Sequence, residues 1–297
     1  MSSTELIQQL VNGLSLGGTY ALLALGLAIV FSIMGLINFA HGDLITIGGY
    51  VMWELESHGV GWYWTIPIAI AATTLASVAM ERIAFRRLRG ASVITLLITS
   101  FAVSFFIEHC LGIFISPRAQ GISVPDWLNR AVHFGPITVP MVQVLTIIVT
   151  LVCVVLLGWM LKHTKVGVAM RAAAEDFKTA QLVGVRANRV VVAAFALAGG
   201  LAGVASVLYI ARSGAVQPTT GFDPVVKAFI ATVVGGLGNL HGAVVGGFLL
   251  GFTEVAFNAF LPAGVLPFSD AFALVVVIGL LLLRPHGLLG RSGELRA

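Results

Sequence analysis

Two stretches of apolar sequence carry the same short polar pattern. Each contains an asparagine that is followed, two or three residues later, by the pair His-Gly. A glycine pair comes next in both stretches, and Glu54 and Glu254 each follow the preceding histidine by 13 residues. The residues of the pattern are Asn38, His41 and Gly42 in the first stretch and Asn239, His241 and Gly242 in the second. Two interpretations are open: a trace of internal duplication, or a chance match of two short segments.

The chemistry of these residues depends on whether they lie inside a membrane or at its boundary. Glycine can interrupt a membrane helix, and the backbone groups that it frees then line a cavity. Paired broken helices near the middle of a membrane would offer backbone groups to a zwitterionic substrate. Alternatively, the asparagines and histidines cap helix ends at the inner boundary of the membrane. Both roles, a translocation path that includes Glu254 and simple helix capping, remain hypotheses at this point.

Two acidic residues lie within apolar sequence, where a carboxylate that faces lipid is costly. Glu108 and Glu254 are therefore expected to face other helices, a partner subunit or water. Each is either a packed carboxylate with a partner or part of a proton relay. Lys227 either pairs with a carboxylate or extends to the membrane surface. The apolar runs hold no paired carboxylates, no HExxH and no GxSxG, so an intramembrane enzyme is not expected.

One polar segment, residues 162–189, interrupts the apolar sequence. Its apolar positions approximate one face of a helix, and Gly184 is a typical helix stop, so we predict a short helix over residues 171–183. The apolar face consists of Met170, Ala173, Ala174, Phe177 and Leu182. The segment is either an interfacial helix that only links two spans or a docking element for a soluble motor protein. Its many small residues suit a tight protein groove.

The composition indicates which elements must position these residues. Hydrophobic residues make up 58% of the 297 positions and charged residues only 10%, against about 25% charged residues in a soluble domain. We therefore predict an all-α polytopic membrane protein with eight or nine helical crossings. The candidate spans are residues 6–42, 64–80, 92–115, 139–161, 190–211 and 271–283, with glycine-containing apolar stretches at 44–53 and 225–260. The stretch 225–260 crosses twice, crosses once, or enters and returns.

Two further features are expected to be structural only. The first apolar run is not expected to be a signal peptide, because it lacks a basic start and its apolar core is too long. Cys110 and Cys153 both lie in apolar runs, without metal-ligand spacing or an obvious disulfide context. We expect both cysteines to be small buried hydrophobic side chains.

Basic residues gather in three segments, and this bias predicts the orientation in the membrane. The segments are the connection 81–91, the insert 162–189 and the C-terminal tail with Arg284, Arg291 and Arg296. If all three face the cytoplasm, the N-terminus lies outside and the C-terminus inside. The connections 54–63, 116–137 and 213–224 then lie outside. The net charge of +4 follows from this topology and from contact with anionic membrane lipid, so no nucleic-acid partner is expected.

Three blocks of sequence, residues 18–50, 167–206 and 235–254, resemble the branched-chain amino acid family of ABC importer permeases. The first, residues 18–50, reads GTYALLALGLAIVFSIMGLINFAHGDLITIGGY and is similar to the N-terminal hallmark of that family. The second, residues 167–206, reads GVAMRAAAEDFKTAQLVGVRANRVVVAAFALAGGLAGVAS and is similar to its signature region. The third, residues 235–254, reads GGLGNLHGAVVGGFLLGFTE. The likeness covers most of the chain, is greatest to the LivH-type permeases, and implies one transmembrane permease domain over residues 1–297.

The resemblance also implies partners. Members of the family pair with a second permease, two cytoplasmic ATPase subunits and a periplasmic or lipid-anchored substrate-binding protein. The insert would then be a cytoplasmic loop whose coupling helix docks in an ATPase cleft. Its coupling positions would be Arg171, Glu175, Asp176, Ala180 and Gly184. The chain has no GxxxxGK[ST] loop, so we expect ATP and Mg on the partner subunits, and neither cofactor, metal nor enzymatic activity in this chain.

The function implied by the resemblance is that of the permease in an ATP-driven importer of the bacterial inner (plasma) membrane. It would work by alternating access, with branched-chain amino acids as the favoured substrates and urea or short amides as the alternative. A hypothesis from another class is a self-sufficient, ion-coupled secondary transporter or channel that uses Glu108 and His109. The longest outer connection, residues 116–137, either contacts the substrate-binding protein or is a rigid spacer.

Overall fold

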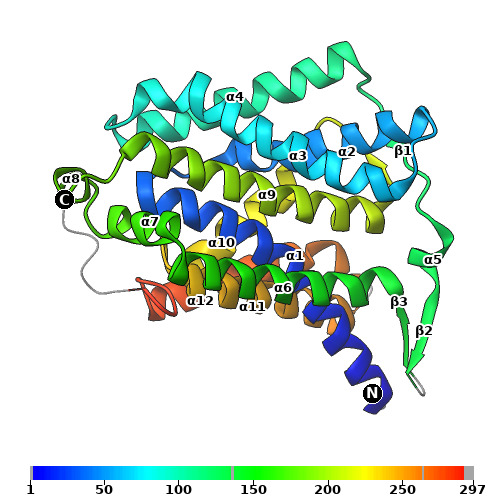
Figure 1. Cartoon of the computed structure of the whole chain (residues 1–297). Coiled ribbons are helices and arrows are strands. Elements are labelled where there is room, and N and C mark those ends of the chain that lie inside the picture. The colour runs from blue at the N-terminus through cyan, green and yellow to red at the C-terminus, as the bar shows by residue number, and fades with distance from the viewer. Residues whose placement is uncertain (1–2, 135–136, 263, 291–297) are drawn as a thin grey trace.

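The computed structural model describes residues 3–134, 137–262 and 264–290, and it consists almost entirely of helices (Figure 1). Six helices in these ranges are long and apolar enough to cross a membrane. They are α1 (Ser3–Met34), α3 (Trp62–Met80), α4 (Val93–Phe114), α6 (Met141–His163), α9 (Ala187–Ser213) and α11 (Leu240–Phe260). They form a bundle in which α1 begins at one end and α12 finishes at the other. The predicted all-α polytopic class is therefore confirmed.

Three apolar helices are shorter than a full crossing. They are α2 (Asp43–Ser57), α10 (Phe222–Gly235) and α12 (Ser269–Leu283), with 15, 14 and 15 residues. At about 1.5 Å per residue they span roughly 21–23 Å, against about 30 Å for a membrane core. The predicted eight or nine crossings would require these shorter helices to cross as well, so that number remains a prediction.

Glycine marks both places where an apolar run breaks into two helices. The candidate span 6–42 is shorter as a helix than predicted, because α1 ends at Met34 and Gly35 follows with φ +64°. A 3₁₀ turn, η1 (Phe39–His41), then leads into α2. The stretch 225–260 forms two helices, α10 and α11, and the turn between them contains Gly236 and Gly238 at φ +109° and +81°. Only glycine adopts such angles without strain.

Helix α1 lies at the centre of the bundle. Of its most apolar window, 83% is buried, against 17% for α4 and 22% for α6, so α4 and α6 form the outer surface. Small residues let α11 approach α1 closely, because a Cβ atom at Gly251 would collide with the backbone of Gly17. Likewise, a Cβ atom at Gly247 would lie 2.6 Å from Ala21 Cα. Close contact between small residues is a common way to join membrane helices.

Helices α3 and α9 form a second tightly packed pair. A Cβ atom at Gly203 would collide with Thr73 Oγ1, and one at Gly199 would lie 2.5 Å from Ser77 Cβ. Ser77 Oγ donates a hydrogen bond of 2.7 Å to the carbonyl oxygen of Phe195. The two helices are therefore joined both by close backbone approach and by a buried hydrogen bond.

A pair of neighbouring glycines in α9 tests this packing. We expect Gly199→Ala to lower the thermal unfolding temperature of the purified protein, because the added methyl group overpacks the contact at a cost of about 1–3 kcal/mol. Gly200→Ala is the matched control, because its Cβ atom would meet only Thr74 Oγ1 at 3.7 Å. Equal unfolding temperatures for the two variants would contradict the close α3–α9 contact.

Short strands lie at one end of the bundle (Figure 1). Strand β1 (Gln120–Gly121) pairs antiparallel with β4 (Ala215–Val216), with Gln120 opposite Val216. Strand β2 (Ala131–Phe134) pairs antiparallel with β3 (Ile137–Pro140), next to the short helix α5 (Asp126–Asn129). This end therefore holds the described part of the connection 116–137 (residues 116–134 and Ile137) and the connection 213–224, and the charge pattern predicts that both connections lie outside. A 3₁₀ turn, η4 (Leu266–Phe268), precedes α12.

The opposite end of the bundle gathers basic connections. It contains a π-helical turn, η2 (Glu81–Phe85), a 3₁₀ turn, η3 (Arg86–Leu88), and the two helices of the insert, α7 (Lys165–Glu175) and α8 (Phe177–Leu182). Arg89 hydrogen-bonds Asn188 at the start of α9, so the first two basic segments touch. In the third segment, Arg291 and Arg296 lie outside the described residues. Grouping at one end agrees with the predicted orientation, while the side of the membrane remains a prediction.

Candidate translocation path and coupling segment

The first Asn-His-Gly motif lies in the break between α1 and α2, and its polar side chains are buried. Asn38 and His41 are 3% and 1% exposed, and Asp43, at the start of α2, is 2% exposed. The atoms Asn38 Oδ1, His41 Nε2 and Asp43 Oδ2 have no hydrogen-bond partner among the residues that the structure describes. Native proteins satisfy nearly all buried polar atoms with protein, water or ligand. Three such atoms within six residues make this break a buried polar centre.

Neighbouring helices hold this break in place. The backbone N–H of Phe39 donates to Ser100 Oγ of α4 at 3.2 Å. The ring of Phe39 stacks on the ring of Phe101 in α4, with the ring centroids 4.4 Å apart. The centroid of the Phe39 ring also lies 5.3 Å from that of Phe229 in α10. The conformation of the break therefore depends on α4 and α10 as well as on its own sequence.

The starts of the short helices α2 and α10 meet beside this polar centre. A Cβ atom on Gly42 would collide with the carbonyl oxygen of Gly221, and one on Gly221 would collide with Gly42. The N–H of Gly221 donates to Thr46 Oγ1 at 3.0 Å. Helix N-termini carry partial positive charge, whereas Asp43 and Asp223 place carboxylates in the first turns. The junction therefore combines the partial positive charge of two helix starts with two carboxylates, of which Asp223 is paired with Lys227.

The second Asn-His-Gly motif caps a helix, as the alternative interpretation predicts. Asn239 Oδ1 accepts hydrogen bonds from the N–H groups of His241 (3.0 Å) and Gly242 (3.1 Å). The side-chain amide of Asn239 also donates to the carbonyl oxygen of Leu289 at 2.7 Å. A Cβ atom at Gly242 would collide with the carbonyl oxygen of Gly235, so this glycine lets α10 and α11 turn closely. The His241 side chain is exposed.

The two motifs therefore have different surroundings. Leu36 and Ile37 in the first break and Leu237 and Gly238 in the second line one small cavity, so the breaks are neighbours. In the first motif, however, the Asn and His side chains are buried, whereas in the second the Asn side chain caps α11. The short helices α2 and α10 meet at their N-terminal ends, where Gly42 lies against Gly221. Gly221 belongs to neither motif, so the comparison of the two motifs did not identify it.

Glu254 belongs to a partly buried ion cluster of four helices. Its carboxylate accepts hydrogen bonds from Tyr20 (2.9 Å) and from Lys227 Nζ (3.1 Å). Lys227 also lies 3.4 Å from Asp223 and 3.3 Å from Asp270, so it pairs with carboxylates rather than extending to the surface. Glu254 is thus a packed and partnered carboxylate. Its network joins α1, α10, α11 and α12.

The insert forms two helices, not the single helix predicted over residues 171–183. Asp176 separates α7 from α8 and caps α8, since its carboxylate accepts hydrogen bonds from the N–H groups of Lys178 (2.9 Å) and Thr179 (3.0 Å). Aspartate in this role favours the start of a new helix. The hydroxyl of Thr179, together with these N–H groups, holds the pKa of Asp176 below its usual range. Gly184, at φ +92°, lies just after the end of α8.

This lowered pKa gives a pH-dependence with a definite sign. The contribution of the Asp176 cap to stability is complete above the ordinary aspartate pKa of about 3.9 and is lost only as the pH falls through the lower value of the folded protein. A spin label at Gln181→Cys should therefore stay immobile down to about pH 4 and become mobile below it. With Asp176→Asn, which caps without titrating, mobility should not change with pH. A label that becomes mobile at the same pH in both proteins would contradict the assignment.

The predicted coupling positions face in different directions. Ala180 is buried, together with Met170 and Ala173 of the predicted apolar face, whereas Ala174 and Leu182 of that face are exposed. Arg171 and Glu175 are exposed and line a cavity of about 350 Å³. The other lining residues come from α1, α6, α7 and from Gly238, Asn239, Leu240 and His241. The insert therefore lies against the second break and the end of α1.

The outermost part of the insert is an apolar tip that sequence reasoning missed. Leu182 and Val183 are 87% and 77% exposed, at the end of α8. The sequence predicts Leu182 on one apolar helical face with Met170 and Phe177, because a single helix over residues 171–183 carries the helical period through Asp176. The break at Asp176 changes the direction of the helix, and that signal was visible only as an Asp followed two residues later by Lys-Thr.

The other residues that the sequence analysis singled out are the two cysteines and Glu108. Cys110 and Cys153 are both free and partly buried. Glu108 is partly buried on α4, one turn after Ser104, which hydrogen-bonds Asp43. Within residues 3–134, 137–262 and 264–290, no group of three or more His, Cys, Asp and Glu side chains is placed to hold a metal ion.

Comparison with known proteins identifies the family. Residues 9–283 match the family described as "Branched-chain amino acid transport system / permease component". The high-affinity branched-chain amino acid transport system permease protein BraD of Pseudomonas aeruginosa is 35% identical, and the match covers 96% of each chain. The corresponding protein LivH of Escherichia coli (strain K12) is 33% identical with the same coverage, and a probable LivH of Methanocaldococcus jannaschii is 27% identical over 91% of this chain and 88% of its own. No solved structure matches significantly. The chain therefore belongs to the permease component family of branched-chain amino acid transport systems.

Proposed function

We propose that this protein is the membrane-spanning permease of an ATP-driven importer for branched-chain amino acids, in the bacterial inner membrane. Its N-terminus would lie outside and its C-terminus inside. The family match over residues 9–283 and the printed names of relatives that align along 96% of the chain support this proposal. The partners would be a second permease, two ATPase subunits and a periplasmic or lipid-anchored substrate-binding protein.

The translocation path would pass the junction of α2 and α10. The observation that carries this proposal is the set of unpaired, buried polar atoms of Asn38, His41 and Asp43 beside the touching helix starts at Gly42 and Gly221. Short helices that begin within the membrane supply backbone N–H groups to anionic groups of substrates. The apolar helices around the junction would accept the aliphatic side chain of the substrate.

The coupling machinery would be the insert, residues 162–189, as a cytoplasmic loop. ATP binding would draw the two ATPase subunits together and displace α7 and α8, and the path would then open outward. After hydrolysis it would relax and open inward. The exposed tip Leu182–Val183 supports this role, because covering two large apolar side chains with a partner removes them from water and lowers the free energy of the complex. Arg171, Glu175, Asp176, Ala180 and Gly184 would position the tip, and ATP and Mg would belong to the partners.

Reconstitution tests the proposal. The complete complex in proteoliposomes, with the substrate-binding protein on the substrate side and ATP on the ATPase side, should accumulate radiolabelled leucine, isoleucine or valine. Uptake should cease without ATP and continue when a protonophore collapses the proton gradient. Accumulation of urea or acetamide instead would overturn the substrate assignment. Uptake that needs no ATP and disappears with the proton gradient would overturn the ATP-driven mechanism.

A further inference from the structure

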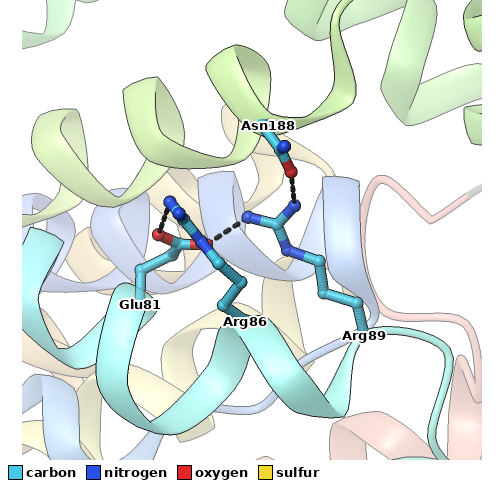
Figure 2. Close-up of polar contacts among 4 residues, drawn as sticks. All are labelled: Glu81, Arg86, Arg89 and Asn188. Carbon is cyan, nitrogen blue, oxygen red and sulfur yellow. Dashed lines mark hydrogen bonds and ion pairs between the residues drawn. The ribbon is translucent and has the colours of Figure 1, made fainter.

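A fully buried carboxylate lies where α3 ends, outside the path and the insert. The Glu81 side chain is 0% exposed and opens the π-helical turn η2. Arg86 donates to both of its oxygens, with Nη2 to Oε2 at 2.8 Å and Nε to Oε1 at 3.2 Å, and Arg89 donates to Oε1 as well (Figure 2). Fork-like pairs of this kind fix direction as well as distance.

The same cluster also contacts α9, the helix that follows α8 in the chain. Arg89 also donates to Asn188 Oδ1, so its guanidinium bridges α3 and α9, as Figure 2 shows. Asn188 is the second residue of α9 and lies at the end of the insert, four residues after Gly184. Asn188 lies only six residues after the last residue of α8. A displacement of α8 would therefore act directly on the Glu81–Arg89–Asn188 connection between α3 and α9.

The cluster continues a contact that already joins the two helices deeper in the bundle. Further along, Ser77 bonds the Phe195 carbonyl, and Gly199 lies against α3. Without a link at the end, α9 could bend there while α3 stayed in place. A π-helical turn is rare and is frequent at functional sites. The ion cluster spans η2, because Glu81 is the first residue of this turn and Arg86 and Arg89 come after its last residue.

We propose that Glu81 is a positioning residue for transport: through Arg89 and Asn188, its carboxylate locks the end of α3 to the start of α9. A displacement of α7 and α8 then moves α3 and α9 as one unit. This inference rests on the proposed function. It predicts that cutting the link leaves the complex assembled and able to hydrolyse ATP, but lowers the number of substrate molecules transported per ATP.

Asn188→Ala cuts the link with the least risk to folding, because Asn188 is exposed and the buried Glu81–Arg86 pair remains. Glu81→Gln removes the charge while keeping the shape. Arg82→Gln and Arg87→Gln are the matched controls, since both are exposed basic residues of the connection that holds Glu81 and lie outside the insert. All variants, and the double variant Glu81→Gln/Asn188→Ala, are measured in the complete reconstituted complex for assembly, ATP hydrolysis and leucine uptake.

We expect Asn188→Ala and Glu81→Gln each to keep assembly and ATP hydrolysis, and to lower uptake per ATP about tenfold, a usual size for coupling between sites. The double variant should fall no further, because both substitutions cut one link. The controls should match the wild type. Unchanged uptake per ATP in Asn188→Ala, effects that multiply in the double variant, or losses that only follow the amount of assembled complex would each overturn the role of Glu81. Absence of ATP-driven uptake by the wild-type complex would overturn the proposed function as well, so the two failures differ.

Discussion

Replacing Asn38 with leucine is expected to raise the thermal unfolding temperature while reducing uptake by about 10- to 100-fold. Asn38 is buried, and its Oδ1 has no partner among the described residues, so an apolar side chain of similar shape removes an unpaired polar atom that costs about 1–3 kcal/mol. Uptake should fall, because a hydrogen bond to a charged group of the substrate is worth about 1.5–3 kcal/mol and tenfold corresponds to about 1.4 kcal/mol. Opposite changes in stability and activity identify a group that serves the substrate.

Asn239→Leu is the matched control for this prediction. Asn239 has the same side chain in the other motif, but its oxygen caps α11 and its amide bonds Leu289. This substitution should lower the unfolding temperature, since loss of an N-cap costs about 1 kcal/mol. The measurements are thermal unfolding of the purified protein and initial uptake rates in proteoliposomes. If Asn38→Leu lowers stability and activity in parallel, as Asn239→Leu would, Asn38 has a structural role only.

Replacing Leu182 and Val183 together with aspartate should abolish ATP-driven uptake and prevent copurification of the ATPase subunits. Both side chains are highly exposed at the end of α8, so the fold does not depend on them. Fully burying an exposed Leu or Val side chain contributes about 1.5–3 kcal/mol, and two buried charges without partners would oppose docking further (about 30-fold per 2 kcal/mol). The amount of permease in the membrane should stay unchanged.

Lys178→Ala with Gln181→Ala provides the control on the same short helix, because both side chains are exposed and polar. This double variant should copurify with the ATPase subunits as the wild type does. Normal ATPase copurification and uptake by the Leu182→Asp/Val183→Asp protein would show that the apolar tip is not the docking element.

Much of the helical framework could be predicted from apolar runs alone. The run 92–115 corresponds to α4 and the run 139–161 to α6, each within two residues at either end, since a membrane helix must satisfy its own backbone. The ends of α1 and α2 could not be placed in the same way. Residues 35–42 carry no Asp, Glu, Lys or Arg and continue the uncharged run, so the sequence does not mark the end of α1 at Met34, before Gly35 at φ +64°.

The sequence predicted Asn38, His41 and Gly42 of the candidate site, but neither Asp43 nor the pairing of Gly42 with Gly221. The glycines of both His-Gly motifs are needed at close backbone crossings, and the sequence singled them out. The partner of Gly42 is Gly221, which lies far away in the chain and carries no distinctive neighbours. Tertiary contacts of this kind leave no periodic signal.

The buried cluster at Glu81 was missed for a physical reason. The sequence from Glu81 to Arg89 reads as a basic, solvated connection, and basic residues there were counted only for orientation. A carboxylate among arginines becomes buried only because the π-helical turn directs Arg86 and Arg89 back onto it. Charge counting records the excess of positive charge but not which side chain is enclosed.

The orientation of the insert tests the account most directly, because only a cytoplasmic loop can be displaced by cytoplasmic ATPases. The measurement is labelling of Lys178→Cys, in a background with Cys110 and Cys153 replaced by serine, with a membrane-impermeant maleimide in spheroplasts and in inside-out vesicles. We predict labelling in inside-out vesicles and none in intact spheroplasts. Labelling in spheroplasts and none in inside-out vesicles would place α7 and α8 outside the cell and contradict the account.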